Sequence, residues 1–331
     1  MKQIFKSNSP TAVVFGGSGF IGRYIVHRLV RSGYKVRVAV RKPNEALFLK
    51  TYGEVGQVEI LACSVLDVES VQSCLQGSSI VVNCVAGSLS ETKLKNFEKY
   101  YIFGPEIIAK SASSSDVKKL IHISSIGVHP SSISMYSRTK AKGERRVLKH
   151  FPGAIILRPS LVFGHEDMFF NRFASMATFS PFIPIVGRNT KFQPVYVNNI
   201  ADAVARAVST TGVEGVYELG GPEILTYEEL MKKMLKIIRR KRIIFPLPIF
   251  FAKSLAFGFS VIKSLTAGFV QPPITLDNIK QLEKDNLVSG SVKSFSDLDI
   301  SPDSLDSVLP NYLYRYRPHG QYTETTESAR R

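Results

Sequence analysis

Three patterns in the sequence predict an α/β protein with a doubly wound parallel sheet and a smaller helical portion toward its C-terminal end. Glycines recur every third residue between an early apolar run and an amphipathic segment. Short, almost continuously apolar segments then alternate with helix-like segments, and this alternation stops near residue 222. Such alternation is typical of parallel strands that helices cover on both faces. A chain of 331 residues is long enough to bury a sheet of this kind.

The stretch 12–22 reads AVVFGGSGFIG and predicts a strand, a tight turn and the start of a helix. In a Rossmann-type fold the first glycine permits the turn, the second lets backbone N–H groups approach a pyrophosphate, and the third allows helix and strand to pack closely. The phosphates bind at the helix N-terminus, where free N–H groups and the dipole favour an anion. A glycine turn that binds nothing is the alternative. The predicted cofactor-binding residues here are Gly16, Gly17, Ser18, Gly19, Phe20, Ile21 and Gly22.

Further strands and helices follow at the intervals of βαβ units. After the first strand, strands are predicted at 35–40, 58–62, 80–85 and 119–123, and helices at 68–75 and 97–112. Small residues follow two of these strands. Ala86 leaves room for a cofactor across the sheet edge, while Ser124 and Ser125 end the strand at 119–123. We therefore add Ala86 and Ser124 to the predicted cofactor contacts.

The second strand ends at Arg41, about twenty residues after the last glycine of the turn. An acidic residue usually binds the ribose 2′-hydroxyl of NAD at this position. A cation suits a 2′-phosphate instead, so the sequence favours NADPH (NADP+) over NAD(H). The alternative is that Arg41 and its neighbour Lys42 form a solvated charge pair at the end of a strand.

Tyr136 and Lys140 stand four residues apart at the start of another predicted helix and so share one of its faces. A lysine cation makes a neighbouring phenol a better proton donor and can bind a ribose, and a hydroxyl such as that of Ser125 can position a carbonyl. The YxxxK pattern arises often by chance. Its place after a glycine-rich turn and a Ser-Ser strand end makes Ser125, Tyr136 and Lys140 the catalytic candidates, with Lys140 also a cofactor contact.

The net charge of +16 is concentrated in one segment. Residues 230–276 contain no Asp or Glu and nine basic side chains. A helix is predicted at 227–240 and an amphipathic helix at 249–270. Polar residues in the second helix argue against a transmembrane span, which leaves a helix in the headgroup plane of an anionic membrane or a helix of the protein's own core. Nucleic acid is not an expected partner, because no recognition motif accompanies the basic residues.

The cysteines, the N-terminus and the C-terminal end carry weaker signals. Cys63, Cys74 and Cys84 lack metal-ligand spacing, so we expect reduced core thiols and no metal site. The N-terminal residues show neither a secretory signal nor a long transit peptide, as expected of a cytosol-facing or already mature chain. The segment 311–331 combines tyrosines and arginines with a polar tail, which is the composition of a partner surface and equally of a strap along the protein itself.

Taken in order, these motifs resemble the landmarks of the extended short-chain dehydrogenase/reductase superfamily. Besides GGSGFIG, the Ser-Ser strand end and YSRTK, the matching stretches are ILRPSLVFG (156–164), PVYVNNIADAV (194–204) and YELGGPEILTYEEL (217–230). The resemblance implies that Pro159 lies in the segment beneath the nicotinamide and that Asp67 remains near the adenine. We accordingly expect a Rossmann domain at 1–225, a basic helical portion at 226–310 and an aromatic-Arg segment with a polar tail at 311–331.

Four stretches are similar to a narrower family, the NAD(P)H-binding accessory subunit of respiratory complex I of the alpha subcomplex subunit 9 type. They are FGHEDMFFNRFASM (163–176), KFQPVYV (191–197), FPLPIFFAK (245–253) and PPITLDNIKQLEKDNLVS (272–289). The resemblance implies a structural subunit that carries NADPH and assembles with other complex I subunits. With the basic segment, it implies a peripheral location on an anionic membrane surface. That surface is the cytoplasmic face of a bacterial inner membrane or the matrix side of the mitochondrial inner membrane.

Departures from the superfamily pattern bear on catalysis. Phe15 replaces a common Thr and Ser64 replaces a common Asp, changes that cofactor binding survives. Ser125 and Tyr136 are only eleven residues apart, shorter than the spacing usual in epimerases and dehydratases. A shortened loop encloses less substrate, so we expect no turnover by this chain itself. An active NADP-dependent reductase or epimerase of the same superfamily, acting on a small molecule, is the alternative that the intact YxxxK supports.

Overall fold

The computed structural model describes residues 9–87, 94–254, 256 and 275–322. Contacts divide the chain into two compact units, each built from three separate stretches. Unit 1 comprises Met1–Pro159, Val197–Leu219 and Ser289–Ser301, and unit 2 comprises Ser160–Tyr196, Gly220–Val288 and Pro302–Arg331. A division by contacts does not test which segments fold independently, so the domains expected at 1–225, 226–310 and 311–331 stay predictions.

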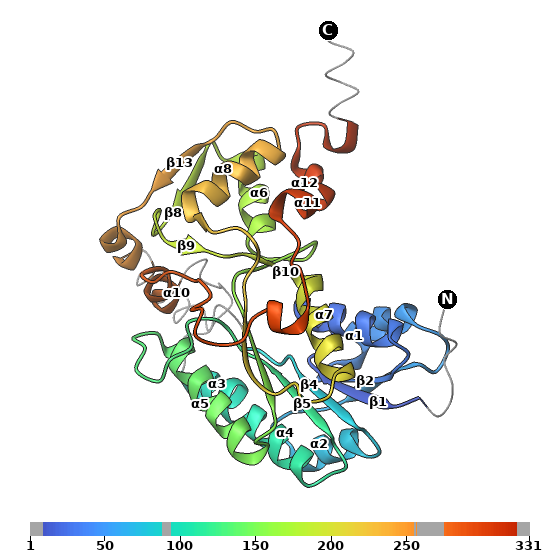
Figure 1. Ribbon diagram of the computed structural model, residues 1–331. Helices are drawn as coiled ribbons and strands as arrows, with labels where there is room; N and C mark the ends of the chain where they lie inside the picture. The colour runs from blue at the N-terminus through green and yellow to red at the C-terminus, as the bar shows by residue number, and fades with distance from the viewer. Residues whose placement is uncertain (1–8, 88–93, 255, 257–274, 323–331) are drawn as a thin grey trace. The chain divides into compact units, whose positions relative to one another are not determined.

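Unit 1 contains a seven-stranded parallel sheet, which confirms the predicted fold class (Figure 1). The strand order is β11-β6-β5-β4-β1-β2-β3. The order reverses between β1 and β4, and a doubly wound sheet binds its ligand at the carboxyl end of this switch point. The strands are β1 (Thr11–Phe15), β2 (Lys35–Val40), β3 (Val58–Ala62), β4 (Ile80–Asn83), β5 (Lys119–Ile123), β6 (Ile155–Pro159) and β11 (Gly215–Leu219).

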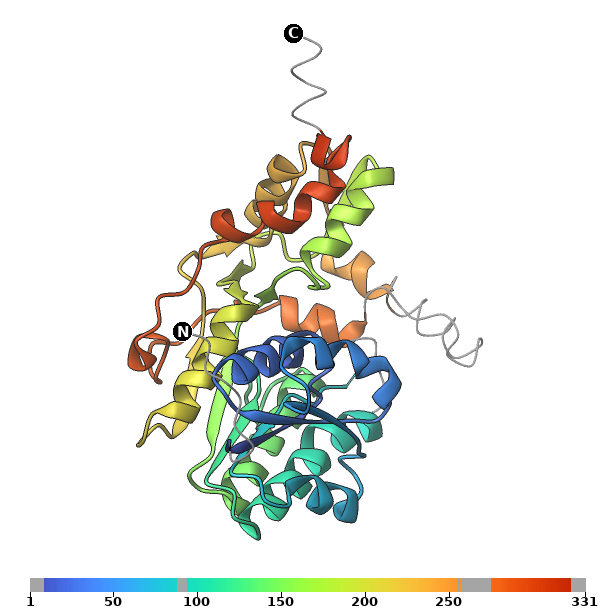
Figure 2. The same ribbon diagram turned by 90° about the vertical axis from the view of Figure 1, so that its right-hand side faces the viewer.

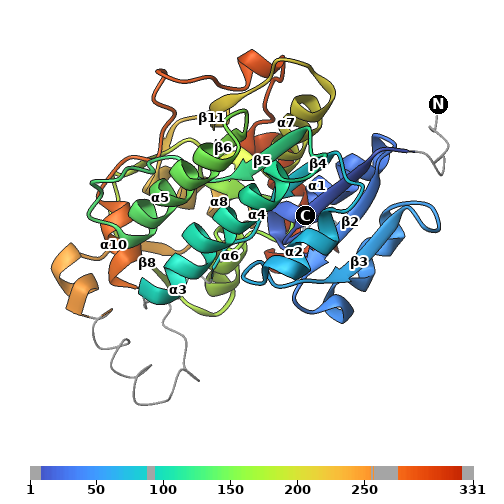
Figure 3. The ribbon, with the colours of Figure 1, turned by 90° about the horizontal axis from the view of Figure 1, so that it is seen from below.

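Helices cover both faces of this sheet, as Figure 3 shows. On one face α1 (Phe20–Arg31) lies against α7 (Val197–Ser209). On the other face α4 (Gly104–Ser113) packs between α2 (Val68–Leu75) and α5 (Met135–His150). The unit also contains the short helix α3 (Leu94–Glu98) and the 3₁₀ segments η1 (Pro43–Tyr52) and η3 (Ser296–Leu298).

Apolar spacing decides which face of each helix is buried. α1 buries Ile25, Val26, Leu29 and Val30, which recur at helical spacing. On the opposite face, side chains of α2, α4 and α5 pack with Val13 and Phe15 of β1 in one core cluster. Full burial of an aliphatic side chain of this size stabilises a fold by about 1.5–3 kcal/mol. The central strands therefore lie between two apolar layers, as their near-continuous apolar sequence predicted.

The helix expected at 97–112 contains an interruption that the sequence did not predict. A π-helical turn, η2 (Lys99–Phe103), separates α3 from α4. Gly143 of α5 packs directly on this turn, because a Cβ added there would lie 1.8 Å from the carbonyl oxygen of Tyr101. Only glycine allows α5 to approach the π turn this closely.

Unit 2 combines short helices with three two-stranded ribbons. β7 pairs with β10 and β8 with β13 in parallel, and β9 pairs with β12 in antiparallel orientation. The sequence did not predict these ribbons, because strands of two to four residues are too short to show a period of two. The elements are β7 (Val162–Phe163), α6 (Phe170–Phe179), β8 (Phe182–Ile185), β9 (Lys191–Phe192), β10 (Val195–Tyr196), β12 (Leu225–Thr226), α8 (Tyr227–Ile237), β13 (Ile243–Pro246), α10 (Leu276–Leu282), α11 (Leu305–Val308), α12 (Pro310–Leu313), η4 (Tyr314–Tyr316) and η5 (Gly320–Tyr322).

The helix expected at 227–240 is α8, which begins as its sequence indicates and ends earlier. Thr226 and Glu229 form a capping box at its start, which satisfies N–H groups of the first turn. Leu230 and Met234 face the core of the unit and are fully buried. Arg239 adopts a left-handed conformation with φ of 52°. The helix therefore stops before the basic run 239–242, whose first two residues the predicted helix included.

The C-terminal aromatic-Arg segment is a strap along unit 2. Helix α12 lies against α6 and α8, and α11 packs on α12 and adds Leu305 and Val308 to the same core cluster; both helices are red in Figures 1 and 2. Tyr312 is buried and donates a hydrogen bond to Asp167 at 2.5 Å. Arg315 donates to the side-chain oxygen of Asn171 at 2.5 Å. Of the two alternatives left open by the sequence, the structure therefore shows the strap for residues up to 322, and residues 323–331 lie outside the described part of the chain.

The amphipathic helix predicted at 249–270 lies largely outside the described residues. Residues 249–254 are helical. Ala252 and Ala256 pack with Ile279 of α10 in a small buried cluster. Among the helices of the described residues, none combines the length and the apolar character needed to cross a bilayer.

Candidate nucleotide-binding site

The glycine-rich turn between β1 and α1 requires glycine at several positions for different reasons. Gly16 has φ of 74°, and a Cβ there would lie 3.1 Å from the backbone of Cys84, which follows β4. At Gly22 a Cβ would lie 2.4 Å from the carbonyl oxygen of Gly16, and at Gly17 it would lie 2.7 Å from the Val38 side chain. A Cβ at Gly19 would meet only the Gly16 oxygen, at 3.3 Å. The turn is therefore packed against the sheet on one side and open at Gly19.

The N-terminus of α1 is available for an anion. Gly19 is its N-cap residue and supplies no side-chain hydrogen bond, and the first turn contains no acid. The first helical N–H groups have no partner within a helix. Those of Phe20, Ile21 and Gly22 therefore face the open side of the turn, with Ser18 just before it. Arg23 donates to the Ser18 carbonyl at 3.2 Å and holds the turn in this form. This arrangement fits a pyrophosphate.

Three predicted residues stand beyond the carboxyl ends of neighbouring strands. Arg41 directly follows β2 and is exposed. Asp67 is the N-cap residue of α2, yet its carboxylate makes no capping hydrogen bond. Ala86 is exposed in the loop after β4. The guanidinium of Arg41 donates to the hydroxyl of Tyr100 at 3.1 Å and lies over its ring, 5.4 Å from the ring centroid. The sequence did not predict that Tyr100 contacts Arg41, because the two residues are 59 positions apart and the π turn brings them together.

The predicted catalytic pair is assembled on α5. Ser134 caps this helix by accepting from the Ser137 N–H, which fixes where the helix starts. The Lys140 ammonium lies 5.2 Å from the ring centroid of Tyr136 and is almost fully buried. It also lies 5.6 Å from the ring centroid of Tyr101, which meets Tyr136 edge-on at 5.4 Å. The structure therefore places a second tyrosine, Tyr101 of the π turn, against the predicted pair.

Ser124 and Ser125 carry unsatisfied hydroxyls. Their side-chain oxygens are buried and, within the described residues, have no hydrogen-bond partner. A buried hydroxyl without a partner costs about 1–3 kcal/mol, so such groups are typical of ligand sites. Next to them, Pro159 at the end of β6 accepts from the Ile126 N–H at 3.0 Å. The open glycine turn at the end of β1 fits the central pyrophosphate of a nicotinamide dinucleotide, and the orphaned hydroxyls at the end of β5 fit its nicotinamide end.

A buried polar pair behind the site was missed in the sequence. Asn83 at the end of β4 and the Nδ1 atom of His122 in β5 lie 3.1 Å apart. Asn83 also accepts from the Val85 N–H at 3.0 Å, which orders the loop that leads to Ala86. Burial, with a smaller effect of the Lys140 charge, lowers the pKa of His122 to about 3, so this ring is neutral. The available signal was a polar residue inside each of two otherwise apolar strands.

Tyr101 also fixes the loop that follows β4. The Gly87 N–H donates to the Tyr101 hydroxyl at 3.0 Å. A Cβ at Gly87 would lie 3.5 Å from ring atoms of both Tyr100 and Tyr101. Both tyrosines of the π turn therefore flank the strand end at which a cofactor is expected.

The three cysteines are free thiols. Cys63 and Cys74 are buried and free, and Cys84 is half-buried and free. A hydrogen bond from Cys74 lowers the pKa of Cys63 to about 7, and the same bond raises the pKa of Cys74. Among the described residues, no three His, Cys, Asp or Glu side chains are grouped so that they could hold a metal ion.

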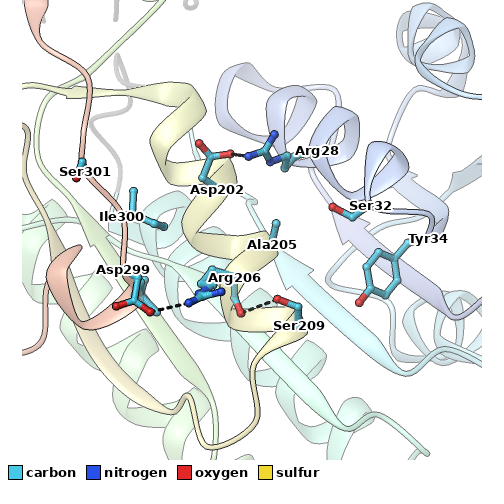
Figure 4. A pocket seen from close by; sticks show the side chains of 11 residues that line it. Arg28, Ser32, Tyr34, Asp202, Ala205, Arg206, Ser209, Asp299, Ile300 and Ser301 are labelled. Carbon is cyan, nitrogen blue, oxygen red and sulfur yellow. Dashed lines mark hydrogen bonds and ion pairs between the residues drawn. The ribbon is translucent and has the colours of Figure 1, made fainter. Parts of the chain in front are cut away.

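A surface hollow of about 570 Å³ lies elsewhere on unit 1, between α1, α7 and η3 (Figure 4). An ion pair joins Arg28 to Asp202, and a second joins Arg206 to Asp299 at 2.6 Å. None of the predicted site residues lines it. Both arginines have carboxylate partners, so the hollow carries no uncompensated charge that would indicate a ligand.

Comparison with known proteins identifies the class to which this site belongs. A model of the 3-beta hydroxysteroid dehydrogenase/isomerase family matches residues 13–212. The chain is 13% identical to the Bordetella bronchiseptica enzyme WbmG, whose structure was solved in complex with NAD, with a TM-score of 0.71 over 95% of this chain and 96% of that one. The chain is therefore a Rossmann-type protein of the extended short-chain dehydrogenase/reductase class, in which a nicotinamide cofactor is implied.

Relatives narrow this class to one family. The chain is 34% identical over 325 residues to NADH dehydrogenase (ubiquinone) 1 alpha subcomplex subunit 9, mitochondrial, of Arabidopsis thaliana, covering 96% of this chain and 80% of the relative. It is 31% identical over 314 residues to the Mus musculus protein of the same name, covering 93% and 81%. The chain belongs to the alpha subcomplex subunit 9 family of NADH dehydrogenase (ubiquinone), which confirms the resemblance seen in its motifs.

Proposed function

We propose that this chain is an NADP(H)-carrying accessory subunit of respiratory complex I, NADH:ubiquinone oxidoreductase, and that it has no turnover of its own. The observation that carries the proposal is an intact dinucleotide cradle in a chain whose relatives are named as subunits of NADH dehydrogenase (ubiquinone). Its partners are the other subunits of that assembly. Its part in respiratory electron transport is structural.

The cofactor assignment rests on the charge at the end of β2. Arg41 stands where NAD-binding folds place an acid, so a 2′-phosphate gains a cationic partner and a 2′-hydroxyl gains little. Bound nucleotide supplies hydride chemistry, whereas the residues of this chain hold and orient it. The glycine turn 16–22 binds the pyrophosphate, Asp67 and Ala86 contact the adenosine side, and Lys140 binds the nicotinamide ribose. Ser124, Ser125 and Pro159 line the nicotinamide end.

The absence of turnover rests on the surroundings of Tyr136. The segment from Ser125 to Tyr136 is short, and the ring of Tyr101 packs edge-on against Tyr136. A substrate carbonyl would need a place near the Tyr136 hydroxyl, and the short segment provides little enclosure for it. We infer that Ser125 and Tyr136 are retained for binding and structure, with their catalytic role vestigial.

A peripheral membrane location is proposed from the exposed apolar side chains of unit 2. The ribbon of β8 and β13 exposes Phe182, Ile243 and Phe245, and the helical residues Phe250 and Phe251 are also more than half exposed. Aromatic side chains next to cations are typical of proteins that bind the headgroup region of anionic bilayers. The surface in question is the matrix side of the mitochondrial inner membrane or the cytoplasmic face of a bacterial one.

Several cations that the sequence assigned to this membrane surface hold unit 2 together instead. Arg240 donates to the Tyr316 carbonyl at 2.7 Å and Arg242 to the Ala177 carbonyl at 2.8 Å. Lys233 pairs with Glu223 at 2.6 Å. The membrane test therefore changes exposed Lys236 and Lys241, which leaves these internal contacts in place.

The experiment that tests the function isolates the tagged full-length chain from detergent-extracted membranes of its source. We expect it to copurify with NADH:ubiquinone oxidoreductase subunits and to release NADP(H) on acid extraction. Tyr136→Phe should leave both results nearly unchanged, and Lys140→Ala should lower nucleotide retention because it removes a ribose contact. A chain that copurifies with no such subunits, or that reduces a carbonyl substrate with a rate lost in Tyr136→Phe, would support the active-enzyme alternative.

A flotation assay tests the membrane proposal separately. The purified chain should float with vesicles that contain anionic lipid, float less with neutral vesicles, and detach partly at high salt. Replacing Phe250 and Phe251 by Ser, or Lys236 and Lys241 by Gln, should reduce flotation with little change in the melting temperature. Binding that is identical for neutral and anionic vesicles would contradict the electrostatic part of the proposal.

A further inference from the structure

The π-helical turn at Lys99–Phe103 brings two neighbouring tyrosines to different parts of the nucleotide site. Such turns are rare and are found mostly at functional sites. Tyr101 contacts Lys140 and Tyr136, while Tyr100 contacts Arg41 after β2. A π turn contains one residue more than a regular α-helical turn. This extra residue changes the direction in which the rings of Tyr100 and Tyr101 point. The turn thus places one tyrosine at each end of the predicted site.

Arg41 and Tyr100 form a defined pair. One guanidinium nitrogen of Arg41 donates to the phenol oxygen at 3.1 Å, and the guanidinium carbon lies 5.4 Å from the ring centroid. A stacked arginine of this kind retains most of its other donors for an additional anion. In the described part of the chain no carboxylate neutralises Arg41, whereas the adjacent Lys42 is paired with Glu45 at 2.8 Å. The free positive charge at this strand end is therefore that of Arg41.

The phenol of Tyr100 is suited to the same anion. Its oxygen accepts a hydrogen bond from Arg41, so its own hydrogen is directed elsewhere, and among the described residues no acceptor takes it. A phosphate oxygen placed against the pair would accept from both side chains. The ring also restricts the rotamers of Arg41, so less conformational entropy is lost when an anion binds.

We propose that Tyr100 is a specificity-determining positioning residue that acts through Arg41 to select nucleotides with a 2′-phosphate. The inference rests on the proposed NADP(H) binding and adds the residue that orients the discriminating cation. NADH presents a neutral 2′-hydroxyl to the same pair and gains little from the orientation of the guanidinium. Tyr100 should therefore influence the preference between the two nucleotides and not binding in general.

The test measures dissociation constants of NADPH and NADH for the purified full-length chain, its Tyr100→Phe and Tyr100→Leu variants, and Arg41→Ala. Tyr100→Phe removes the hydroxyl and keeps the ring. It should weaken NADPH about tenfold and NADH less than twofold, since one hydrogen bond to a charged group is lost. Tyr100→Leu, which also removes the stacked ring, should weaken NADPH further. Adenosine 2′,5′-bisphosphate and adenosine 5′-monophosphate, used as probes of this end alone, should reproduce the difference.

A matched control and a double-mutant cycle separate positioning from general damage. Tyr101→Phe removes a hydroxyl from the same π turn and should leave the ratio of the two dissociation constants unchanged, whatever it does to each. In an Arg41→Ala background, Tyr100→Phe should change NADPH binding less than twofold, because the residue through which Tyr100 acts is gone. Melting temperatures of the nucleotide-free variants report whether each chain is folded. If Tyr100→Phe does not fold, Tyr100→Leu is used in its place.

The outcomes distinguish this inference from the proposed function. A wild-type chain that binds neither nucleotide contradicts the proposed function itself. A wild-type chain that prefers NADPH, with the same preference in Tyr100→Phe and Tyr100→Leu, overturns the inference about Tyr100 alone. Equal weakening of NADPH and NADH would also overturn it, because the residue would then support the fold and not the choice of nucleotide.

Discussion

The two units differ in the sequence separation of the contacts that stabilise their key features. In unit 1, the residues of the glycine-rich turn are neighbours in sequence, and Gly22 contacts the backbone of Gly16 only a few positions away. In unit 2, Tyr312 bonds to Asp167 across 145 residues of chain. A local motif therefore defines the glycine-rich turn of unit 1, whereas a long-range polar contact ties the C-terminal strap to the rest of unit 2. This difference explains why the glycine-rich turn could be predicted from the sequence and the Tyr312–Asp167 contact could not.

The units also differ in what their critical positions require. Unit 1 depends on space, since a single added methyl group would clash with backbone atoms of the turn. Unit 2 depends on satisfied polar groups, since Asp167 is buried and accepts from Tyr312 and from the N–H groups of Gly164 and Asn171. The four predictions below test this contrast, starting with the largest expected effect.

Gly22→Ala should have the largest effect, because its methyl group would lie 2.4 Å from a backbone oxygen that cannot move without opening the turn. We expect loss of nucleotide affinity by about a hundredfold and destabilisation by about 3 kcal/mol. Titration with NADPH and thermal unfolding of the nucleotide-free chain measure the two effects. Gly19→Ala is the matched control, because its methyl group faces the open side and should lower affinity with little loss of stability. Unchanged affinity in Gly22→Ala would show that the turn is not packed as described.

Acid should destabilise unit 1 through His122. Burial lowers the pKa of His122 to about 3, below its unfolded value, so the unfolded state binds more protons as the pH falls through 6.5. The stability is present above pH 6.5 and decreases toward pH 3, by about 3 kcal/mol at pH 4. Burial instead raises the pKa of Asp167 in unit 2, so its protonation favours the folded state.

Urea unfolding between pH 4 and pH 7 measures this dependence. His122→Leu removes the titrating ring, and its stability should vary less with pH by about 1.4 kcal/mol per unit between pH 6 and pH 4. Asp167→Asn, in the other unit, should not flatten the curve in this range. A wild-type chain and a His122→Leu variant with parallel curves would indicate that the ring is accessible to protons in the folded state.

Tyr312→Phe should destabilise unit 2 by about 2 kcal/mol, because the buried Asp167 carboxylate loses a donor and the ring is kept. Hydrogen exchange in α6 should report the change, since the strap packs against this helix. Tyr314→Phe alters an exposed tyrosine of the same segment and serves as the control. Equal exchange in the two variants would mean that the strap contributes through its apolar contacts alone.

The smallest effects should separate the cations of the basic run. Arg242→Gln loses the bond to the Ala177 carbonyl at 2.8 Å and should cost about 1 kcal/mol of unfolding free energy. Lys241→Gln changes an exposed neighbour and should stay within about 0.5 kcal/mol. Chemical denaturation of both variants gives the comparison. The prediction is contradicted if Lys241→Gln is the more destabilising of the two.

The sequence by itself determined the elements whose cause is local. Apolar runs predicted strands β1 to β5 of the central sheet but not β6 and β11, and the segment after the glycine turn was predicted to be the amphipathic helix that α1 forms. The glycine turn could be predicted because the spacing of its glycines is itself the motif, and Gly22 packs on Gly16 only six residues away. The helix α8 could be predicted from the helical spacing of its apolar residues. The pairing of Tyr136 with Lys140 followed from helical periodicity alone.

Only the tertiary structure decided the rest, because those contacts join segments that no short pattern links. The π turn forms where Gly143 of α5 admits it, and it sets the positions of Tyr100 and Tyr101. The short ribbons of unit 2 exist through pairing and not through propensity, since two to four residues carry no periodicity. The basic run illustrates the same limit. Composition showed its charge, but the partners of Arg240 and Arg242 are backbone carbonyls that only folding brings to them.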